Sequence, residues 1–348
     1  MEGKHIILLT DYKDIFGSKQ YSHIYRGGMD IARIIELFNK DGFHATIRPI
    51  SEVPNTNYDK NNTFFIYTSS EDKFDLYKSY IEDIILHLDQ LEYHVIPKYL
   101  YLRAHNNKVS MELIRSQYKN NFINSISSQV FGSLDELYVS KIDFSYPVVI
   151  KKAIGAMSRG VFLANNYSEL IKYAKKASQS FNILHDLKEK LRKVKYRNKY
   201  ILESPFRNKF IVQSFIPSLN NDWKVLVYWN KVFILYRGNR KHDFRASGSG
   251  CFEFKKEIPE GILDFAFSVR RIFDVPNISL DVGYSKGKFY LFEFQFINFG
   301  TTTLEKSPFY FEKINNNWEL KEDNSVLEDV YAYSIINFLN NSESNFRI

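Results

Sequence analysis

The chain has 348 residues, of which 44% are hydrophobic and 16% aromatic, so it can build the cores of two or three domains. Its net charge of +7 is mild for this length, which allows an anionic small ligand and does not require nucleic acid. The single cysteine, Cys251, excludes an intrachain disulfide and favours a reducing cytoplasmic compartment. No apolar run approaches the roughly 20 residues of a membrane helix. The first apolar run ends at Asp11 without a cleavage pattern, so we expect no signal peptide.

The first hundred residues alternate between short apolar runs and helix-period segments. We expect strands at 5–10, 63–68 and 94–96, and helices at 28–40 and 74–88. This alternation predicts a small parallel sheet with helices on its faces. Gly27 and Gly28 precede the first helix but lack the spacing of a dinucleotide fingerprint. We therefore interpret the pair as a turn and helix start with a role in substrate binding.

The rest of the chain mixes helices with strands and hairpins. We expect helices at 108–119, 168–176, 260–273 and 326–339, strands at 146–153, 161–163 and 210–216, and hairpins at 223–237 and 277–295. Ser325, with Glu328 three residues later, predicts a capping box at the last helix. The basic run at 188–199 has two interpretations, a solvated helix and loop within a lid, or a polynucleotide contact.

The hairpin at 277–295 is the most informative segment of the chain. Glu293 and Gln295 lie one step apart on one strand face, and a three-residue loop at Gly287 would place Asp281 directly opposite Glu293. Two carboxylates and an amide oxygen suit Mg²⁺. The alternative is an ordinary half-exposed hairpin. Against it, Phe289 and Leu291 are expected on the face of Glu293, where a carboxylate needs a cation or a donor.

Lysine and glycine suggest a phosphate cradle in the middle of the chain. Lys151 ends a β-branched strand, and a turn of small residues follows from Gly155 through Ser158 to Gly160. The lysine supplies a point charge and the turn supplies N–H donors. A plain solvent-facing strand end is the alternative. Gln213, on the apolar strand at 210–216, could offer an amide to a planar base, although a core strand is the default interpretation of this segment.

Charged residues gather on the hairpin at 223–237 and just beyond it. Asp222 and Lys224 share a strand face, and Arg237 and Arg245 follow. Clustered cations can neutralise a transferring phosphoryl group. Taken singly, each of these residues is compatible with ordinary surface charge.

In this order the motifs resemble the ATP-grasp superfamily over about residues 106–300. The likeness is strongest to the ribosomal-protein glutamate ligase type and more distant to D-alanine–D-alanine ligase. The resemblance implies an α/β protein, α+β in its C-terminal part. It implies an N-terminal domain at 1–105, a central lid subdomain at 106–208 and a C-terminal subdomain with the metal site at 209–348, the two subdomains enclosing ATP.

The resemblance also implies roles for particular residues. ATP binding falls to Lys108, Lys151, Gly155, Ser158, Gly160, Gln213, Phe215 and Asp222. Arg245, Lys224 and Arg237 are the implied catalytic residues, and Asp281, Glu293 and Gln295 the implied Mg²⁺ ligands, with Mn²⁺ as an alternative metal. Lys224 replaces the family's usual arginine and Gln295 its usual asparagine. The segment from Asn298 to Thr303 departs from the family's acceptor-pocket motif, so the substrates stay open.

The implied reaction is ATP-dependent carboxylate–amine ligation through an acyl phosphate, with release of ADP and phosphate. Its partners would be a small-molecule or peptide carboxylate and an amine, with no membrane and no nucleic acid; a homodimer is left open. Two alternatives stand beside it. One is a kinase on the same fold that phosphorylates a hydroxyl or a carboxylate. The other is a non-catalytic module that binds nucleotide or nucleic acid.

Overall fold

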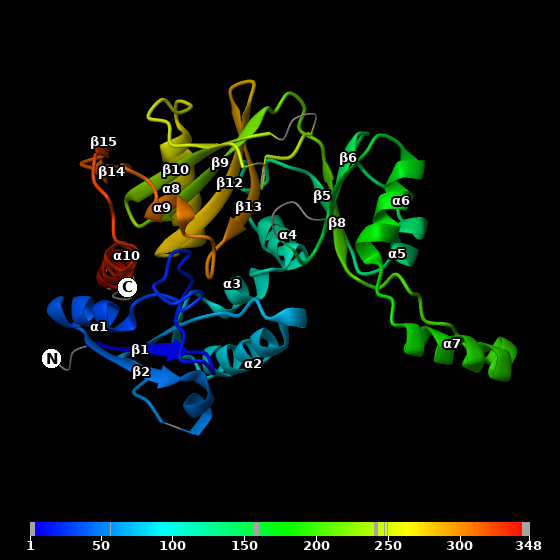
Figure 1. The fold of residues 1–348 in the computed structure, drawn as a ribbon, viewed down its shortest axis with the longest axis horizontal. Coiled ribbons are helices and arrows are strands. Elements are labelled where there is room, and N and C mark those ends of the chain that lie inside the picture. The colour runs from blue at the N-terminus through cyan, green and yellow to red at the C-terminus, as the bar shows by residue number, and fades with distance from the viewer. Residues whose placement is uncertain are drawn as a thin grey trace. The chain divides into compact units, whose positions relative to one another are not determined.

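A computed structural model describes residues 4–55, 57–155, 160–239, 243–246, 248 and 250–342 (Figure 1). The chain forms two compact units. Unit 1 comprises Met1–His105 and Leu219–Ile348, and unit 2 comprises Asn106–Ser218. Unit 1 is thus built from two separate stretches of sequence, and unit 2 from one. The three-part division expected from the sequence stays a prediction.

A four-stranded parallel sheet forms the N-terminal part of unit 1, as predicted. Its strands are β1 (His5–Thr10), β2 (His44–Pro49), β3 (Thr63–Tyr67) and β4 (His94–Ile96), in the order β2-β1-β3-β4. Its helices are α1 (Ile31–Lys40), α2 (Leu76–Gln90) and α3 (Tyr99–Ala104), with the 3-10 turns η1 (Ile50–Asn55) and η2 (Lys73–Asp75). The prediction missed β2, because this edge strand buries only Ala45 and has no apolar run.

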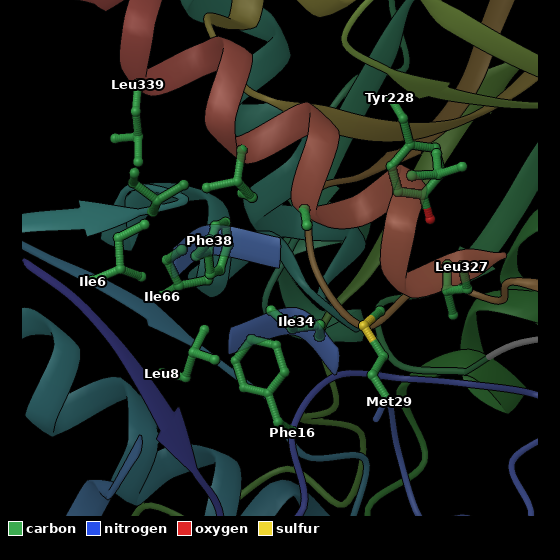
Figure 2. Close-up of a cluster of buried hydrophobic side chains, with 14 of the residues drawn as sticks. Ile6, Leu8, Phe16, Met29, Ile34, Phe38, Ile66, Tyr228, Leu327 and Leu339 are labelled. Carbon is green, nitrogen blue, oxygen red and sulfur yellow. The ribbon is translucent and has the colours of Figure 1, made fainter. Parts of the chain in front are cut away.

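One face of this sheet is covered by helices from both ends of the sequence. Ile6 and Leu8 of β1 share a buried cluster with Phe38 of α1 and with Ile335 and Leu339 of α10 (Leu327–Ser342) (Figure 2). Each side chain in this cluster buries apolar area that would otherwise face water. The N-terminal sheet and the last helix therefore have one common core.

The second sheet of unit 1 is antiparallel. It contains β9 (Asn221–Tyr228), β10 (Lys231–Gly238), β12 (Asn277–Ser285), β13 (Lys288–Gln295), β14 (Tyr310–Ile314) and β15 (Asn317–Lys321), in the order β13-β12-β9-β10-β14-β15, and β11 (Phe252–Glu253) pairs with β10. Two further helices, α8 (Ile262–Phe273) and α9 (Thr302–Glu305), contact this sheet. Both predicted hairpins are present in it.

The hairpin of β12 and β13 pairs Asp281 with Glu293, as predicted, but by a different route. Its turn has two residues, Lys286 and Gly287, both at positive φ, instead of the expected three. The register then shifts by one, because Val282 pairs with Leu291 while Asp281 pairs with Glu293. Phe292 is the extra residue of a β-bulge, and this bulge restores the predicted pair.

The bulge corrects the expected arrangement of side chains. Phe289 and Phe294 both contact rings of α8, at Phe265 and Phe273, although they are an odd number of residues apart. One inserted residue between them is what allows this. Phe289 and Leu291 were both expected on the face of Glu293, and that expectation is wrong. Phe289 packs on α8, and Leu291, fully buried, pairs with Val282, which points to the face opposite Asp281.

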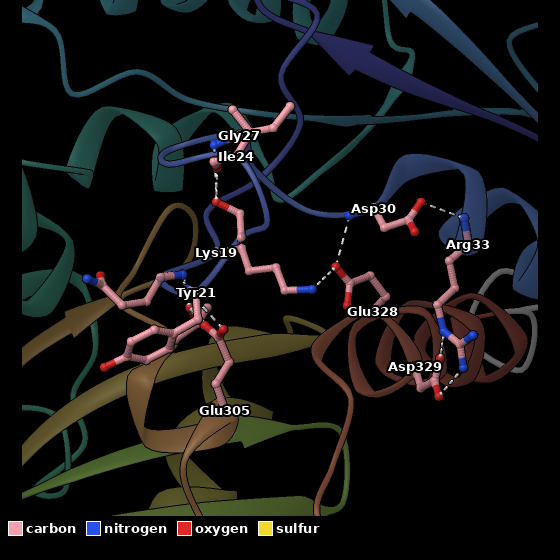
Figure 3. A network of polar contacts seen from close by, with 12 residues as sticks. Lys19, Tyr21, Ile24, Gly27, Asp30, Arg33, Glu305, Glu328 and Asp329 are labelled. Carbon is pink, nitrogen blue, oxygen red and sulfur yellow. Dashed lines mark hydrogen bonds and ion pairs between the residues drawn. The ribbon is translucent and has the colours of Figure 1, made fainter.

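The expected capping box at the start of α10 does not form. Glu328 is buried, and its Oε1 accepts from the backbone N–H of Asp30 at 2.9 Å and from Lys19 Nζ at 2.7 Å. Figure 3 shows both contacts, together with Glu305, which accepts from the backbone N–H of Tyr21 at 3.2 Å. These carboxylates hold the segment between β1 and α1. Glu328 accepts from a backbone N–H of that segment instead of one at the start of its own helix.

Unit 2 is a separate sheet with its own helices. Its strands β5 (Ser128–Phe131), β6 (Val148–Lys152), β7 (Val161–Ala164) and β8 (Phe210–Ser214) follow the order β5-β8-β6-β7, all antiparallel. The helices are α4 (Lys108–Gln117), α5 (Leu134–Val139), α6 (Tyr167–Ser178) and α7 (Ile183–Tyr196), followed by the turn η3 (Arg197–Lys199). Ile150, Leu170 and Phe210 lie in a core confined to this unit.

The basic run of the sequence forms α7 and the turn after it. Five aliphatic side chains of α7 are exposed, namely Ile183, Leu184, Leu187, Leu191 and Val194. Its buried residue is an acid, Glu189, which accepts from the Tyr200 hydroxyl at 2.7 Å. This polar contact joins α7 to the segment that directly follows it. Within the part of the chain that the structure describes, no helix is both long enough and apolar enough to cross a membrane.

Candidate functional site

A row of charged side chains crosses four neighbouring strands of the antiparallel sheet. Arg237 on β10 pairs in register with Asp222 on β9, and Lys224 on β9 pairs with Asp281 on β12. Asp281 in turn pairs with Glu293 on β13. Because Asp222 and Lys224 are two residues apart on one strand, they point to one face. The register thus gathers five of the predicted residues.

Arg237 joins the two aspartates of this row. Its Nε and Nη2 donate to the two oxygens of Asp222 at 2.6 and 2.8 Å. Its Nη2 also lies 2.9 Å from Oδ2 of Asp281, while Lys224 Nζ donates to Oδ1 of Asp281 at 3.0 Å. Asp222 and Arg237 are each only 8% exposed, so the pairs are largely shielded from water. Buried charges of this kind persist only when they are paired.

The neighbouring charges set the pKa of each aspartate. Burial alone would raise the pKa of Asp281, but Arg237 and Lys224 outweigh it and hold that pKa below its ordinary range. Burial raises the pKa of Asp222 to about 6, against the attraction of Arg237 and with repulsion from Asp281. Burial would lower the pKa of Arg237, and the two carboxylates raise it instead. Arg237 therefore stays charged.

The predicted metal ligands lie together at one end of this row. Glu293 is directly across from Asp281, and Gln295 Nε2 lies 3.4 Å from Oε1 of Glu293. Their oxygens form a set that suits Mg²⁺. No group of three or more His, Cys, Asp and Glu side chains with metal-binding geometry occurs in the ranges described above. The third ligand would be the amide of Gln295, and Asp281 would have to share an oxygen between a metal and its cation.

The first predicted phosphate lysine reaches the start of the predicted loop. Lys108 opens α4, and its Nζ donates to the backbone oxygen of Gly155 at 3.0 Å. Asn106 Oδ1 accepts from the backbone N–H of Gly155 at 3.2 Å. Lys108 and Gly155 are therefore brought together within unit 2, 47 residues apart in sequence. Ser158 lies outside the described residues.

Lys151 and Gly160 flank the predicted loop on two paired strands. Lys151 lies near the end of β6, in register with Val161 of β7. Gly160 has a φ of +94°, and a Cβ there would lie 2.8 Å from side-chain carbons of Lys152. Only glycine fits this position without strain. The structure describes Gly160, and the loop residues from 156 to 159 are outside its ranges.

The Gln213 side chain forms a hydrogen bond that the sequence did not indicate. Its Nε2 donates to Oε1 of Glu112 on α4 at 3.0 Å, and it is only 2% exposed. Oε2 of Glu112 accepts from the Ser128 hydroxyl at 2.6 Å. This buried network favours the core-strand interpretation of the Gln213 side chain. Phe215, just after β8, is half-buried.

Arg245 is paired with its near neighbour in the sequence. Its Nε lies 2.9 Å from both oxygens of Asp243, and its Nη2 lies 2.5 Å from Oδ2. The hydrogen bonds that Arg245 donates to Asp243 raise the pKa of Arg245. An arginine held by a carboxylate two residues away has a fixed side-chain direction and keeps its charge.

Two solved structures share this architecture over nearly their whole length. D-cycloserine synthetase DcsG aligns with a TM-score of 0.51 and 9% identity, over 96% of this chain and 99% of that one. A Chryseobacterium gregarium RiPP-associated ATP-grasp ligase, in complex with ADP and a leader and core peptide, aligns with a TM-score of 0.50 and 14% identity, over 97% of each chain. No family model matches the sequence, and no curated protein matches it. The chain therefore shares its overall fold with these two proteins.

Proposed function

We propose that this protein is an ATP-dependent carboxylate–amine ligase that works through an acyl phosphate. The observation that carries the proposal is the row from Arg237 through Asp222, Lys224 and Asp281 to Glu293. Phosphoryl transfer needs little covalent chemistry from the protein, and depends on positioning and on fixed positive charge. This row supplies both, because every cation in it is held by a carboxylate.

In this proposal the charged row acts on the transferring phosphoryl group. Asp281, Glu293 and Gln295 would hold Mg²⁺, which neutralises phosphate charge when bound. Asp281 holds the Lys224 side chain beside the acidic ligands, and Asp222 and Asp281 hold Arg237 there. Arg245 would stabilise the acyl phosphate. In unit 2, Lys108 and Lys151 would contact the ATP phosphates, and Phe215 would contact the base.

The substrates are proposed by chemical class. The Chryseobacterium ligase named above was solved with peptides, so we propose a peptide or amino-acid carboxylate as the first class to test. The acid would attack the terminal phosphate of ATP and release ADP. The amine would then attack the acyl carbon, and phosphate would leave.

The test is a screen that works before the natural amine has been identified. Pools of the twenty amino acids and of short acidic peptides are incubated with ATP, Mg²⁺ and hydroxylamine, which traps an acyl phosphate as a hydroxamate. We expect ADP release that depends on the acid, together with a hydroxamate detected by mass spectrometry. ADP release with a stable phosphorylated product would indicate a kinase instead. Binding of ATP or RNA without turnover would indicate a non-catalytic module.

Two variants test the site assignment in the same assay. Glu293→Ala and Lys151→Ala should each lower acid-dependent ADP release by about a hundredfold, as expected for the loss of a group that stabilises phosphoryl charge. Glu319→Ala and Lys175→Ala are matched controls, because both side chains are exposed and lie outside the proposed site. Wild-type turnover in either site variant would refute the assignment.

A further inference from the structure

The parallel sheet of unit 1 reverses its strand order between β1 and β3. From β1 the chain moves to β2 on one side, and then crosses back to β3 on the other. In open parallel sheets, ligands bind just outside the carboxyl ends of the strands at such a reversal. Thr10 ends β1 here, and Thr68 and Ser69 follow β3. Oγ1 of Thr10 is buried and has no hydrogen-bond partner among the described residues.

A serine, a histidine and a glutamate form a chain at this place. Ser69 Oγ lies 2.9 Å from Nδ1 of His105, and Nε2 of His105 lies 3.3 Å from Oε1 of Glu71. Ser69 and His105 are buried, whereas the Glu71 side chain is 64% exposed. The hydrogen bond from His105 lowers the pKa of Glu71, so this carboxylate is ionised at neutral pH.

The carboxylate decides which ring nitrogen of His105 carries the proton. An ionised Glu71 can only accept, so Nε2 is the donor and Nδ1 of a neutral ring is left as an acceptor. The Ser69 hydroxyl then donates to Nδ1. This is the arrangement in which a base polarises a hydroxyl, with a third group orienting the base.

The backbone of Ser69 is held independently of its hydroxyl. Asn298 Oδ1 accepts from the Ser69 N–H at 3.1 Å, and Asn298 Nδ2 donates to the Ser69 oxygen at 3.0 Å. Asn298 follows Gln295 of the proposed metal site by three residues. The amide of Asn298 therefore ties the end of β13 to the sheet reversal. It also leaves the Ser69 side chain unnecessary for the position of the loop.

We propose that Ser69, His105 and Glu71 form a proton relay that activates the amine substrate; this rests on the proposed ligase function. Ser69 touches the amine, and His105 and Glu71 are positioning residues. The substrate arrives as an ammonium ion, and one N–H proton passes to Ser69 Oγ while the Ser69 proton passes to Nδ1 of His105, which leaves the neutral amine. The nitrogen lone pair forms the C–N bond, the acyl C–O bond breaks, and phosphate leaves with that electron pair. The second proton lost by nitrogen goes to phosphate.

The experiment compares two nucleophiles with different needs for a base. Hydroxylamine is unprotonated at neutral pH and needs no relay, whereas the amino acids of the pool are ammonium ions and need to lose a proton. We expect Ser69→Ala and His105→Gln to lower amide formation at least tenfold, while hydroxamate formation from the same acid stays within twofold of the wild type. Glu71→Gln should lower amide formation less, and because its side chain is exposed, this change leaves the core intact.

Controls separate the relay from folding and from the proposed function. Ser70→Ala, at the next serine, should leave both products unchanged, and thermal unfolding checks that each variant is folded. An equal loss of amide and hydroxamate in the Ser69 and Glu71 variants would overturn the relay, as would no loss of either product. If the wild-type protein forms no hydroxamate with any acid, the ligase function fails first, and the relay fails with it.

Discussion

Arg237 is the residue on which the charged row depends. It is the only side chain in contact with both aspartates among the hydrogen bonds described above, and removing it would leave Asp281 with Lys224 alone and take away the cation that binds both oxygens of Asp222. The sequence predicted each of these residues, because Asp222 and Lys224 are two apart on one strand and Arg237 follows on the next. It could not predict that Arg237 bridges the aspartates, since that contact depends on the register of three strands.

Replacement of Arg237 should destabilise the fold. We expect Arg237→Met to lower the free energy of unfolding by about 3–5 kcal/mol, because two buried carboxylates lose their shared cation. Urea denaturation followed by circular dichroism measures this. The triple variant that also carries Asp222→Asn and Asp281→Asn should recover much of the loss. If Arg237→Met unfolds at the same urea concentration as the wild type, the pairs contribute nothing.

Acid should weaken the fold through Asp281. The folded-state pKa of Asp281 lies below the ordinary value of 3.8, so its stabilising contribution is present above that pH and is lost as the pH falls through the folded pKa. We expect the free energy of unfolding to fall below pH 4 with a slope that Asp281→Asn reduces. Urea titrations from pH 2 to 5 compare the two proteins. An unchanged slope in the variant would contradict the pairing.

The bulge in β13 shows what the sequence could predict about the hairpin and what it could not. The pairing of Asp281 with Glu293 was predicted from an assumed three-residue turn. The structure reaches it with a two-residue turn and one extra residue, Phe292. No apolar pattern signals this insertion, because Phe289, Leu291 and Phe294 are hydrophobic whichever face they occupy. An isolated glycine in the partner strand, Gly283, was the one signal of a close approach.

Gly283 and Phe292 should be energetically coupled. A Cβ at Gly283 would lie 2.5 Å from the Phe292 ring, so Gly283→Ala should destabilise by about 1–3 kcal/mol through overpacking. In the double variant with Phe292→Ala the ring is absent, and the added methyl group should cost much less. Urea unfolding of the four proteins gives the coupling free energy. Additive effects would mean that the ring moves aside freely.

Contacts between distant segments escaped prediction for the same reason. Asn298 binds Ser69 across 229 residues, and Gln213 binds Glu112 across 101. Each residue alone looks like an ordinary loop or strand residue. The parallel sheet and both C-terminal hairpins were predicted well, since these depend on local period and on turn residues. Side-chain partners require the packed structure.

The two units differ in whether they are built from one stretch of the sequence or from two. Unit 2 is continuous, with a four-stranded sheet and a core of its own. Unit 1 joins both ends of the sequence, because Ile6 and Leu8 share a core with Ile335 and Leu339. A cut after residue 105 therefore exposes the apolar surface of the N-terminal sheet that α10 covers.

Fragments should reflect this difference. We expect residues 106–218 alone to fold with a single cooperative thermal transition, because their core is self-contained. Residues 1–105 alone should aggregate or stay unfolded, and co-expression with residues 219–348 should restore a soluble complex. Circular dichroism and size-exclusion chromatography measure both outcomes. A well-folded fragment 1–105 would show that the shared core is dispensable.

Lys4 and Leu339 bring the opposite ends of the described chain into contact, since Lys4 Nζ donates to the Leu339 oxygen at 2.9 Å. A short peptide linker from α10 to β1 could therefore join these two elements without disturbing either sheet. New termini could then be opened at an exposed hairpin such as Lys286 and Gly287. In that rearranged gene, α10 would be encoded directly before the parallel sheet that it covers.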